Sequence, residues 1–340
     1  MIEINGDKGG GQMLRTALTL SVVTGKNFRI HNIRGNRNNP GLKKQHLEAV
    51  KSAKKVSDAY TEGVELGSKE IVFKPGKYRN ESFTANIGTA GSTTLLLDTI
   101  LPVTTQFDEE FRINVKGGTD VKWSPTSLYY KHVKLPLLKE LGLKAELDVE
   151  KTGFYPKGGG ELKLTTRSSS MKSLQLLKRG ELQKIEVYSK ASRDLMSQKV
   201  AERQSDEAEK LLKNEFMSKE VQKSFEYVES ASTGSVLLIK AAYKNSLAGF
   251  DVVGEKGKRS EEVAEEAFQD FMGFHGSDAV VDEYMADQLM VFSAIIGGEY
   301  CVSEITPHIK SNLNVIHCFN IEMEFGRGDS KAVISNRDQD

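Results

Sequence analysis

The chain has 340 residues, of which 38% are hydrophobic and 28% are charged, a composition that is ordinary for a soluble globular protein. This length is too great for one simple core and predicts about two domains. Lys and Arg together number 47, as do Asp and Glu, so the net charge of zero excludes a uniformly basic coat for nucleic acid. A local basic cleft is compatible with that balance, because recognition depends on where the charges lie.

The sequence does not favour a membrane-spanning or a secreted protein. No apolar stretch reaches the roughly 18 residues that span a bilayer, and the N-terminal MIEINGDKGG lacks the basic and then apolar layout of a signal peptide. We therefore expect a cytoplasmic protein with no membrane partner. Cys301 and Cys318 form no CxxC pair and are too few for a disulfide framework, so we expect core thiols or bystanders in a reducing compartment.

Three segments of the chain, residues 9–35, 88–118 and 286–308, share one layout. Each opens with small or turn-forming residues, continues as an apolar helix, turns at glycine or a polar loop, and enters a short alternating strand. The three strands read FRIHNI, FRINVK and YCVSEI. The repeat predicts a large α+β domain built from three similar helix-plus-sheet units.

The spacing of these strands predicts an inserted domain. Phe28 and Phe111 are 83 residues apart, whereas Phe111 and Tyr300 are 189 apart, and the excess of 106 residues is the size of a small domain. Residues 181–275 fit this role, because they contain the strand-like stretches LQKIEVYSKA and GSVLLIKAAY and two helical stretches. The predicted boundaries are 1–180 and 276–340 for the large domain and 181–275 for a smaller inserted α/β domain.

The loops that follow the repeated strands contain most of the unusual polar residues of the chain. They span residues 34–47, 116–130 and 306–312. If the units are equivalent, each loop leaves its unit at a comparable place, and loops on a rigid scaffold are where sites are usually built. We therefore expect the functional site at these loops.

Glycine-rich stretches offer two candidates for phosphate binding. Gly9, Gly10 and Gly11 stand directly before the first helix, where free N–H groups can bind an anion, although a plain tight turn is an equal alternative. The stretch 254–258 has neither the glycine spacing nor the Ser or Thr of a Walker A loop. A nucleotide would therefore be bound by another fold.

The segment from Arg34 to His46 is a dense set of phosphate donors. Arg binds a phosphate in a bidentate way and Lys adds a point charge, whereas a solvated basic loop is the alternative. Leu42, Leu47 and Val50 indicate that its second half becomes a helix with an apolar face turned inward.

A histidine and the start of the third helix are further candidates. His308 lies in a polar stretch directly after the third strand, and a neutral imidazole there could attack phosphorus, although a lone histidine is more often structural. Asp287 and Gln288 head the third helix, where a carboxylate can simply be a cap. Tyr284 beside them could stack on a base.

Taken together, the motifs resemble the RNA 3′-terminal phosphate cyclase family. The resemblance is carried, in the family's order, by GGGQMLR, IRGNRNNPGLKKQHLEAV, IGTAGSTTLLLDTILP, GGTDVKWSP, GFYPKGGGE, VVGEKGKRSEEVA, EYMADQL and HIKSN. It implies the same three-unit fold with an insertion. It also implies the reaction: AMP passes from ATP to His308 with release of pyrophosphate and then to an RNA 3′-phosphate, and the vicinal 2′-hydroxyl closes a 2′,3′-cyclic phosphodiester and expels AMP.

The resemblance also implies roles for individual residues. His308 matches the histidine that accepts the nucleotidyl group. Tyr284 and Pro125 match positions that enclose the adenine of ATP. The other matches are Met285, Ala286, Asp287, Gln288 and Asp98 in the ATP pocket, and Arg15, Arg34, Arg37, Gln45 and His46 around the RNA terminal phosphate or the ATP phosphates.

Three departures from the family pattern affect what the resemblance implies. The family places a Glu before its Gly-rich start that helps to hold a divalent metal, Mg or Mn, where this chain has Lys8 beside Asp7. Asp98 stands where the family often has Gln. Asp98 and Asp7 are therefore candidate metal ligands, and Lys8 is a candidate replacement for the ion's charge. Ser311 replaces the Thr of the HxxTN motif and keeps the hydroxyl.

Two other functions are weighed against the cyclase. Cyclase-like proteins also serve as non-catalytic RNA-binding ribosome-assembly factors, which lack the nucleotidyl histidine. Enolpyruvyl transferases use a related repeated scaffold without covalent AMP, and no motif here favours them. The presence of His308 together with Tyr284, Asp287 and Gln288 favours the enzyme.

Overall fold

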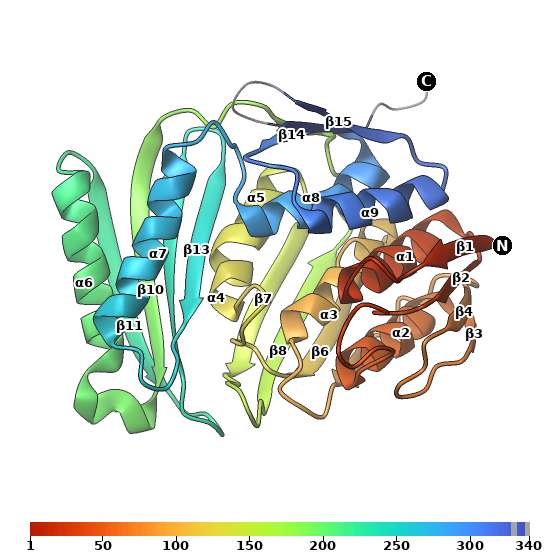
Figure 1. Cartoon of the computed structure of the whole chain (residues 1–340), viewed down its shortest axis with the longest axis horizontal. Helices are drawn as coiled ribbons and strands as arrows, with labels where there is room; N and C mark the ends of the chain where they lie inside the picture. Colours follow the sequence, from red (N-terminus) through yellow and green to blue (C-terminus); the bar gives the residue numbers. More distant parts are fainter. Residues whose placement is uncertain (328–331, 337–340) are drawn as a thin grey trace.

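The computed structural model of the chain describes residues 1–327 and 332–336. In this part of the chain, four mixed sheets of four strands each are combined with helices, which confirms the predicted α+β class (Figure 1). Residues 328–331 and 337–340 of the predicted large domain lie outside the described residues. No helix in the described part is long and apolar enough to span a membrane.

The first sheet belongs to the N-terminal unit. Its elements are β1 (Ile2–Asn5), α1 (Gly11–Thr24), β2 (Phe28–His31), α2 (Lys44–Ser57), β3 (Tyr60–Glu62) and β4 (Ile71–Lys74). The strand order is β1-β2-β4-β3, with β1 and β2 parallel and the other pairs antiparallel. The apolar helix α1 ends at Gly25, whose φ of 68° is the left-handed conformation that favours glycine.

The second and third units repeat this topology. The second contains β5 (Phe83–Asn86), α3 (Thr93–Ile100), a 3₁₀ turn (Val103–Gln106), β6 (Phe111–Gly117), α4 (Ser127–Tyr129), a π-helical stretch (Tyr130–Lys134), α5 (Leu135–Glu140), β7 (Lys144–Lys151) and β8 (Gly160–Arg167). The third contains β9 (Leu174–Leu176), α8 (Glu283–Ile296), β14 (Gly298–Val302), α9 (Pro307–Cys318), β15 (Met323–Arg327) and β16 (Ala332–Asn336). Their orders, β5-β6-β8-β7 and β9-β14-β16-β15, again pair the first two strands in parallel. The predicted three-unit repeat is confirmed.

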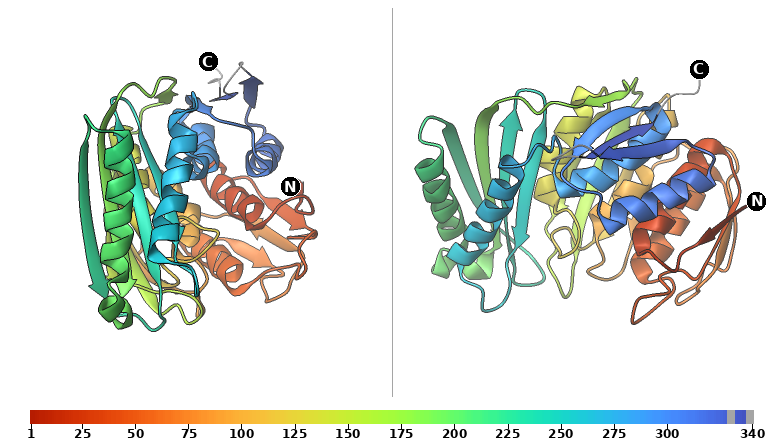
Figure 2. Two further views of the ribbon diagram at one scale, coloured as in Figure 1. Left: turned by 60° about the vertical axis from the view of Figure 1, so that its left-hand side comes forward. Right: turned by 45° about the horizontal axis from the view of Figure 1, so that its top comes forward.

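The fourth sheet lies between β9 and α8 in the chain. Its elements are β10 (Leu182–Ser192), a 3₁₀ turn (Arg193–Gln198), α6 (Val200–Glu215), β11 (Glu220–Val228), β12 (Ser235–Tyr243), β13 (Leu247–Val253) and α7 (Ser260–His275). The strand order is β11-β10-β12-β13, and α6 and α7 cover one face of the sheet (Figure 2). The sequence did not predict β11 and β13. That this module is a separate domain with boundaries at 181 and 275 stays a prediction.

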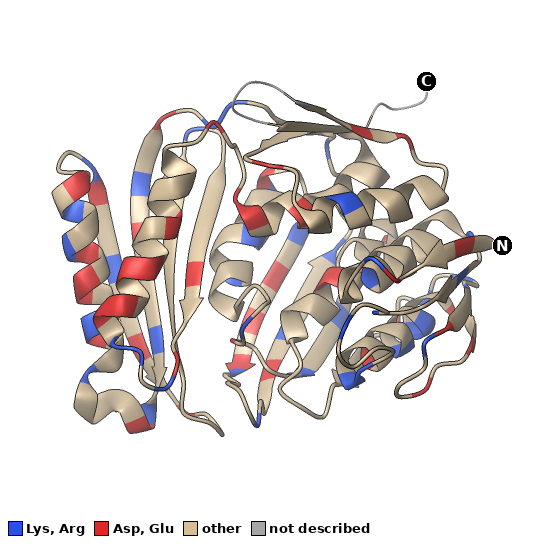
Figure 3. Ribbon diagram, in the orientation of Figure 1, with Lys and Arg blue, Asp and Glu red and all other residues tan. Residues whose placement is uncertain are grey.

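The inner strand β12 of the module's sheet is buried on both faces. Along β12, Leu237 and Ile239 join a hydrophobic cluster under α6 and α7, whereas Val236 and Leu238 join the main core. This alternation follows the two-residue period of a strand and explains why the sequence there reads as one apolar run. The outer helix α6 has basic and acidic residues along its length (Figure 3), among them the ion pair of Lys213 with Glu209.

Five helices of the three units pack against one another. Helix α1 contacts α2, α3, α8 and α9, and α8 contacts α9 (Figures 1 and 2). Residues at the starts of α1, α2, α8 and α9 line a common cavity, so these four helices begin at one place. Cys301 is buried in β14 and Cys318 ends α9 partly buried.

Candidate functional site

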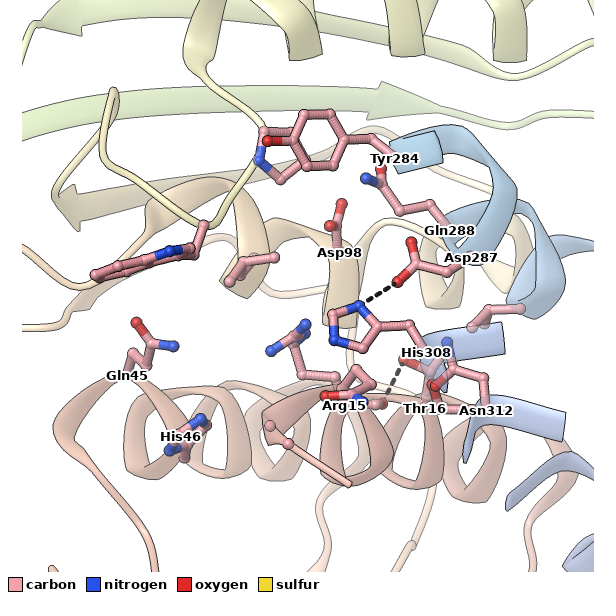
Figure 4. A pocket seen from close by; sticks show the side chains of 18 of the residues that line it. Arg15, Thr16, Gln45, His46, Asp98, Tyr284, Asp287, Gln288, His308 and Asn312 are labelled. Atoms are coloured by element: carbon pink, nitrogen blue, oxygen red, sulfur yellow. Dashed lines mark hydrogen bonds and ion pairs between the residues drawn. The ribbon is translucent and has the colours of Figure 1, made fainter. Parts of the chain in front are cut away.

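A cavity of about 570 Å³ lies where the helix starts converge (Figure 4). The segments that line it are far apart in the sequence, from Gly10 to Asn312. Most of the predicted site residues are brought together there: Arg15, Arg34, Arg37, Gln45, His46, Asp98, Pro125, Tyr284, Asp287, Gln288 and His308.

The start of α1 leaves backbone donors open to the cavity. Its N-cap, Gly10, supplies no side-chain acceptor for the free N–H groups of the first turn. A Cβ on Gly11 would lie only 2.3 Å from Nε2 of His46, so glycine is required by the close approach of α2. Both Gly10 and Gly11 line the cavity, and the helix start therefore favours an anion there.

The imidazole of His308 faces a carboxylate across the cavity. Its Nδ1 lies 3.5 Å from Oδ2 of Asp287, and its side chain is 57% exposed (Figure 4). The contact with Asp287 raises the pKa of His308 above its ordinary value of 6.5, against the effect of partial burial. Asp287 can therefore hold the proton on Nδ1 and leave the lone pair of Nε2 available.

One local prediction around these residues is wrong, and one alternative is excluded. His308 is not in a loop, because α9 begins at Pro307 and the hydroxyl of Thr306 accepts from the N–H of Ile309 at 3.2 Å. Asp287 does not cap α8, because Asp282 is the N-cap and its Oδ1 accepts from the N–H of Met285 at 3.0 Å. A helix start gives His308 a fixed backbone, and Asp287 is free to face it.

Hydrogen bonds between α1 and α9 hold the start of α9 in place. The hydroxyl of Ser311 donates to the carbonyl of His308 at 3.0 Å and accepts from Nε2 of Gln12 at 3.0 Å. Thr16 donates to Oδ1 of Asn312 at 2.9 Å (Figure 4). Ser311 thus supplies the hydroxyl that Thr would supply at this position of the HxxTN motif.

The cationic side of the cavity is formed by arginines with different surroundings. Arg15 is partly buried, and desolvation lowers its pKa while Asp98 and Asp287 oppose that decrease. Arg34 donates from Nη1 to the carbonyls of Asn39 and Gly41 at 2.8 and 2.9 Å, so it braces its own loop.

Arg37 is exposed. It is therefore the arginine of this loop with its side chain most open to solvent and to a ligand.

Gln45 and His46 both make structural contacts at the cavity wall. Oε1 of Gln45 accepts from the N–H of Ser92 at 3.1 Å, next to the start of α3. Nδ1 of His46 accepts from the N–H of Lys43 at 3.1 Å, and burial lowers the pKa of His46 to about 3. His46 is therefore neutral at physiological pH, with the proton on Nε2.

Lys134 is a cavity residue that was not predicted from the sequence. Its side chain is only 2% exposed, forms an ion pair with Asp98, and donates to Oε1 of Gln288 at 2.6 Å. It ends the π-helical stretch, a form that often occurs at functional sites, and lies 4.8 Å from the ring centroid of Tyr130. The available signal was a lysine inside the apolar run YYKHVKLPLL.

The wall predicted for adenine is tied to the inserted module. Tyr284 contacts Tyr129 edge to face at 5.5 Å, and the hydroxyl of Tyr129 donates to Asp282 at 2.6 Å. Asp282 also accepts from the N–H of Gly249 in β13 at 3.0 Å. Burial raises the pKa of Asp282 to about 6.

A second buried carboxylate of β13 reaches the loop of Pro125. Oδ2 of Asp251 accepts from the N–H of Thr126 at 2.8 Å, and burial raises the pKa of Asp251 to about 7. Two hydrogen bonds from β13 thus support the two sides of this wall.

Some predicted residues lie away from the cavity. Met285 and Ala286 are buried in the core, and Asp7 and Lys8 are not among the cavity residues. Lys8 instead lines a separate cavity of about 230 Å³ with Asn5 and Ser311. Binding roles for Met285, Ala286 and Asp7 remain predictions.

Comparison with known proteins gives a consistent picture. A family model described as RNA 3′-terminal phosphate cyclase matches residues 7–325. Proteins named RNA 3′-terminal phosphate cyclase from Saccharolobus islandicus (strain M.14.25) and Archaeoglobus fulgidus are each 43% identical to this chain, over 94% of it and 94% and 95% of their own lengths. A protein of the same name from Halobacterium salinarum is 36% identical over 97% of this chain and 98% of its own length.

Proposed function

Since the chain belongs to the RNA 3′-terminal phosphate cyclase family, we propose that it uses ATP to convert an RNA 3′-phosphate into a 2′,3′-cyclic phosphodiester, with release of AMP and pyrophosphate. One structural observation supports this proposal and points to the atoms that react. The imidazole of His308 is held beside Asp287 in a cavity at which four helices begin.

In the first step, the unprotonated Nε2 of His308 attacks the α-phosphorus of ATP. The bond from that phosphorus to the β-phosphate oxygen breaks, pyrophosphate leaves, and AMP remains on the histidine as a phosphoramidate. Asp287 supports this step by holding a proton on Nδ1. Arg15 and the N–H groups at the start of α1 are placed to stabilise the charge of the phosphates.

In the second and third steps, AMP activates the RNA end and is then expelled. An oxygen of the RNA 3′-phosphate attacks the AMP phosphorus, the bond to His308 breaks, and an RNA–adenylate anhydride forms. The 2′-oxygen then attacks the 3′-phosphorus, loses its proton, and displaces AMP as the ring closes. Such transfers depend mainly on positioning and neutralisation of charge, for which Arg34 and Arg37 are the proposed RNA-side donors.

ATP is held, in this proposal, with its adenine between Tyr284 and Pro125. Both residues line the cavity, and Asp287 and Gln288 follow Tyr284 on α8. An aromatic face and a proline ring suit the two faces of a purine. ATP and an RNA with a 3′-phosphate are therefore the proposed substrates.

The described residues fit a resident divalent ion poorly. They contain no group of three His, Cys, Asp or Glu side chains that could hold one. Asp98 is already paired with the ammonium of Lys134, which would repel a cation beside it, and Asp7 is outside the cavity. We therefore propose that Mg²⁺ or Mn²⁺ enters with the ATP phosphates and is not resident in the protein.

The same ion pair is the observation that favours the second candidate, a catalytically inactive RNA-binding ribosome-assembly factor. A chain that had lost its metal ligand could keep the fold and the basic loop without the chemistry. His308 and Asp287 would then have no reason to face each other in the cavity. The two candidates differ in whether ATP alone modifies the protein.

Incubation with α-labelled ATP and magnesium, followed by denaturing separation, tests this difference. The cyclase should carry a stable label that acid removes and alkali does not, as expected of a phosphoramidate on histidine. His308→Asn should abolish the label, whereas His31→Asn, on a histidine outside the cavity, is the matched control. Absence of label with both magnesium and manganese would instead identify the binding factor.

A further inference from the structure

Trp123 is the single tryptophan of the chain and is 92% exposed, yet it lines the cavity. A residue with both properties lies at the mouth of the cavity. Its φ of 60° is in the left-handed region, which is uncommon for a bulky residue and is held only where the surroundings impose it. An exposed indole contributes little burial to folding, so its position needs another explanation.

The loop that presents Trp123 is anchored on both sides. Before it, Lys122 forms an ion pair with Glu255 of the inserted module. After it, Ser127 donates from its N–H and its hydroxyl, at 2.9 and 2.8 Å, to the buried carboxylate of Asp120. These contacts fix the loop and leave the indole in solvent at its tip.

A ligand ring is the partner that suits this indole. Tyr284 and Pro125 are already assigned to adenine in the proposed function, and both are less exposed than Trp123. Trp123 shares the cavity lining with Arg37, the exposed arginine proposed to hold the RNA phosphate. A terminal phosphate held by Arg37 would leave the base of the same nucleotide free to extend toward the mouth of the cavity, where Trp123 lies.

We propose that Trp123 is a stacking platform for the unpaired base of the RNA 3′-terminal nucleotide. This inference rests on the proposed function, because it takes the occupant of the cavity to be an RNA end. Stacking on an aromatic face tolerates any base, so the platform selects single-stranded 3′ ends over ends buried in a duplex, with little preference for sequence.

The single tryptophan allows binding at this position to be measured without chemistry. Titration with a short single-stranded RNA carrying a 3′-phosphate should quench the tryptophan fluorescence and saturate. The matched RNA whose terminal nucleotide lacks its base should bind about 5- to 150-fold more weakly, the range expected for one base stacked on an aromatic ring. Equal affinity and equal quenching by both RNAs would overturn the proposal.

Substitutions of Trp123 distinguish its role in RNA binding from the transfer of AMP to the protein. Trp123→Ala should weaken RNA binding by a similar factor and lower cyclisation more than self-adenylylation, and Trp123→Phe should restore part of the loss. Phe225→Ala, an exposed aromatic of β11 outside the cavity, is the control. If ATP alone quenches the tryptophan and RNA does not, the indole belongs to the adenine site and the proposal is wrong.

Self-adenylylation distinguishes a failure of this inference from a failure of the proposed function. A protein that labels itself with AMP but shows no base-dependent quenching is a cyclase without this platform. A protein that shows base-dependent quenching but no label has the platform on an RNA-binding factor, and in that case only the catalytic proposal fails.

Discussion

Replacement of Lys134 by methionine tests the buried charge pair at the cavity. The side chain of Lys134 is 2% exposed and that of its partner Asp98 is 12% exposed. Lys134→Met keeps a similar side-chain volume but removes the paired ammonium from the carboxylate of Asp98, which keeps only the more distant charge of Arg15, and leaves Oε1 of Gln288 without its donor. We therefore expect a large decrease in the free energy of unfolding, although the substitution keeps the shape of the side chain.

The size of the loss follows from the surroundings of the pair. Breaking a buried ion pair by removal of one partner costs about 3 to 5 kcal/mol. Because Asp98 keeps some access to water in the cavity, the lower end of that range, about 3 kcal/mol, is the expected decrease in the free energy of unfolding. That is a large share of the roughly 5 to 15 kcal/mol that stabilises a typical domain.

Urea denaturation of the unsubstituted protein and of the variant measures this decrease, provided that their free energies of unfolding depend equally steeply on urea concentration. The double variant Asp98→Leu with Lys134→Met removes both charges and should recover most of the lost stability, because an apolar pair replaces a buried ion pair at little cost. A loss below about 1 kcal/mol in the single variant, or a double variant less stable than the single one, would refute the reasoning.

Four further outcomes are expected. His308→Asn removes self-adenylylation but shifts unfolding by no more than about 0.5 kcal/mol, because the side chain is 57% exposed. Asp287→Asn removes the cause of the raised pKa of His308, so the fraction of neutral imidazole at acidic pH increases and the acid limb of the adenylylation rate moves to lower pH, while the maximal rate falls. Arg34→Ala and Arg37→Ala lower cyclisation more than adenylylation, and only Arg34→Ala also lowers the melting temperature, because Arg34 braces its loop. EDTA abolishes adenylylation by removing the ion that enters with ATP; full activity in EDTA would mean that protein cations suffice.

Much of the fold was predictable because the repeated units have strong local patterns. The apolar helices and alternating strands could be recognised, and the spacing of Phe28, Phe111 and Tyr300 located the insertion. The missed strand β11 is mostly exposed at a sheet edge, so it lacks the apolar alternation that identifies a strand. The start of α9 was misread although Thr306 and Pro307 are a cap and first-turn signal.

The site residues that belong to sequence motifs could be predicted. Contacts between residues that are far apart in the sequence could not. Lys134 could not be assigned, because its partners Asp98 and Gln288 are distant in the sequence and come together only through packing of three helical segments. Asp282 and Asp287 are both acidic residues near one helix start, and only the position of the first turn decides which of them is the cap.

The route of the chain through the inserted module has a mechanical consequence. The chain leaves the third unit after β9 and returns at Asp282, which accepts a hydrogen bond from β13 and carries the helix of Tyr284. A displacement of β13 would therefore be transmitted to the nucleotide wall, and a molecule that binds the module and shifts it would alter the affinity for ATP. Because such coupling is reciprocal, ATP should in turn slow hydrogen exchange in β13.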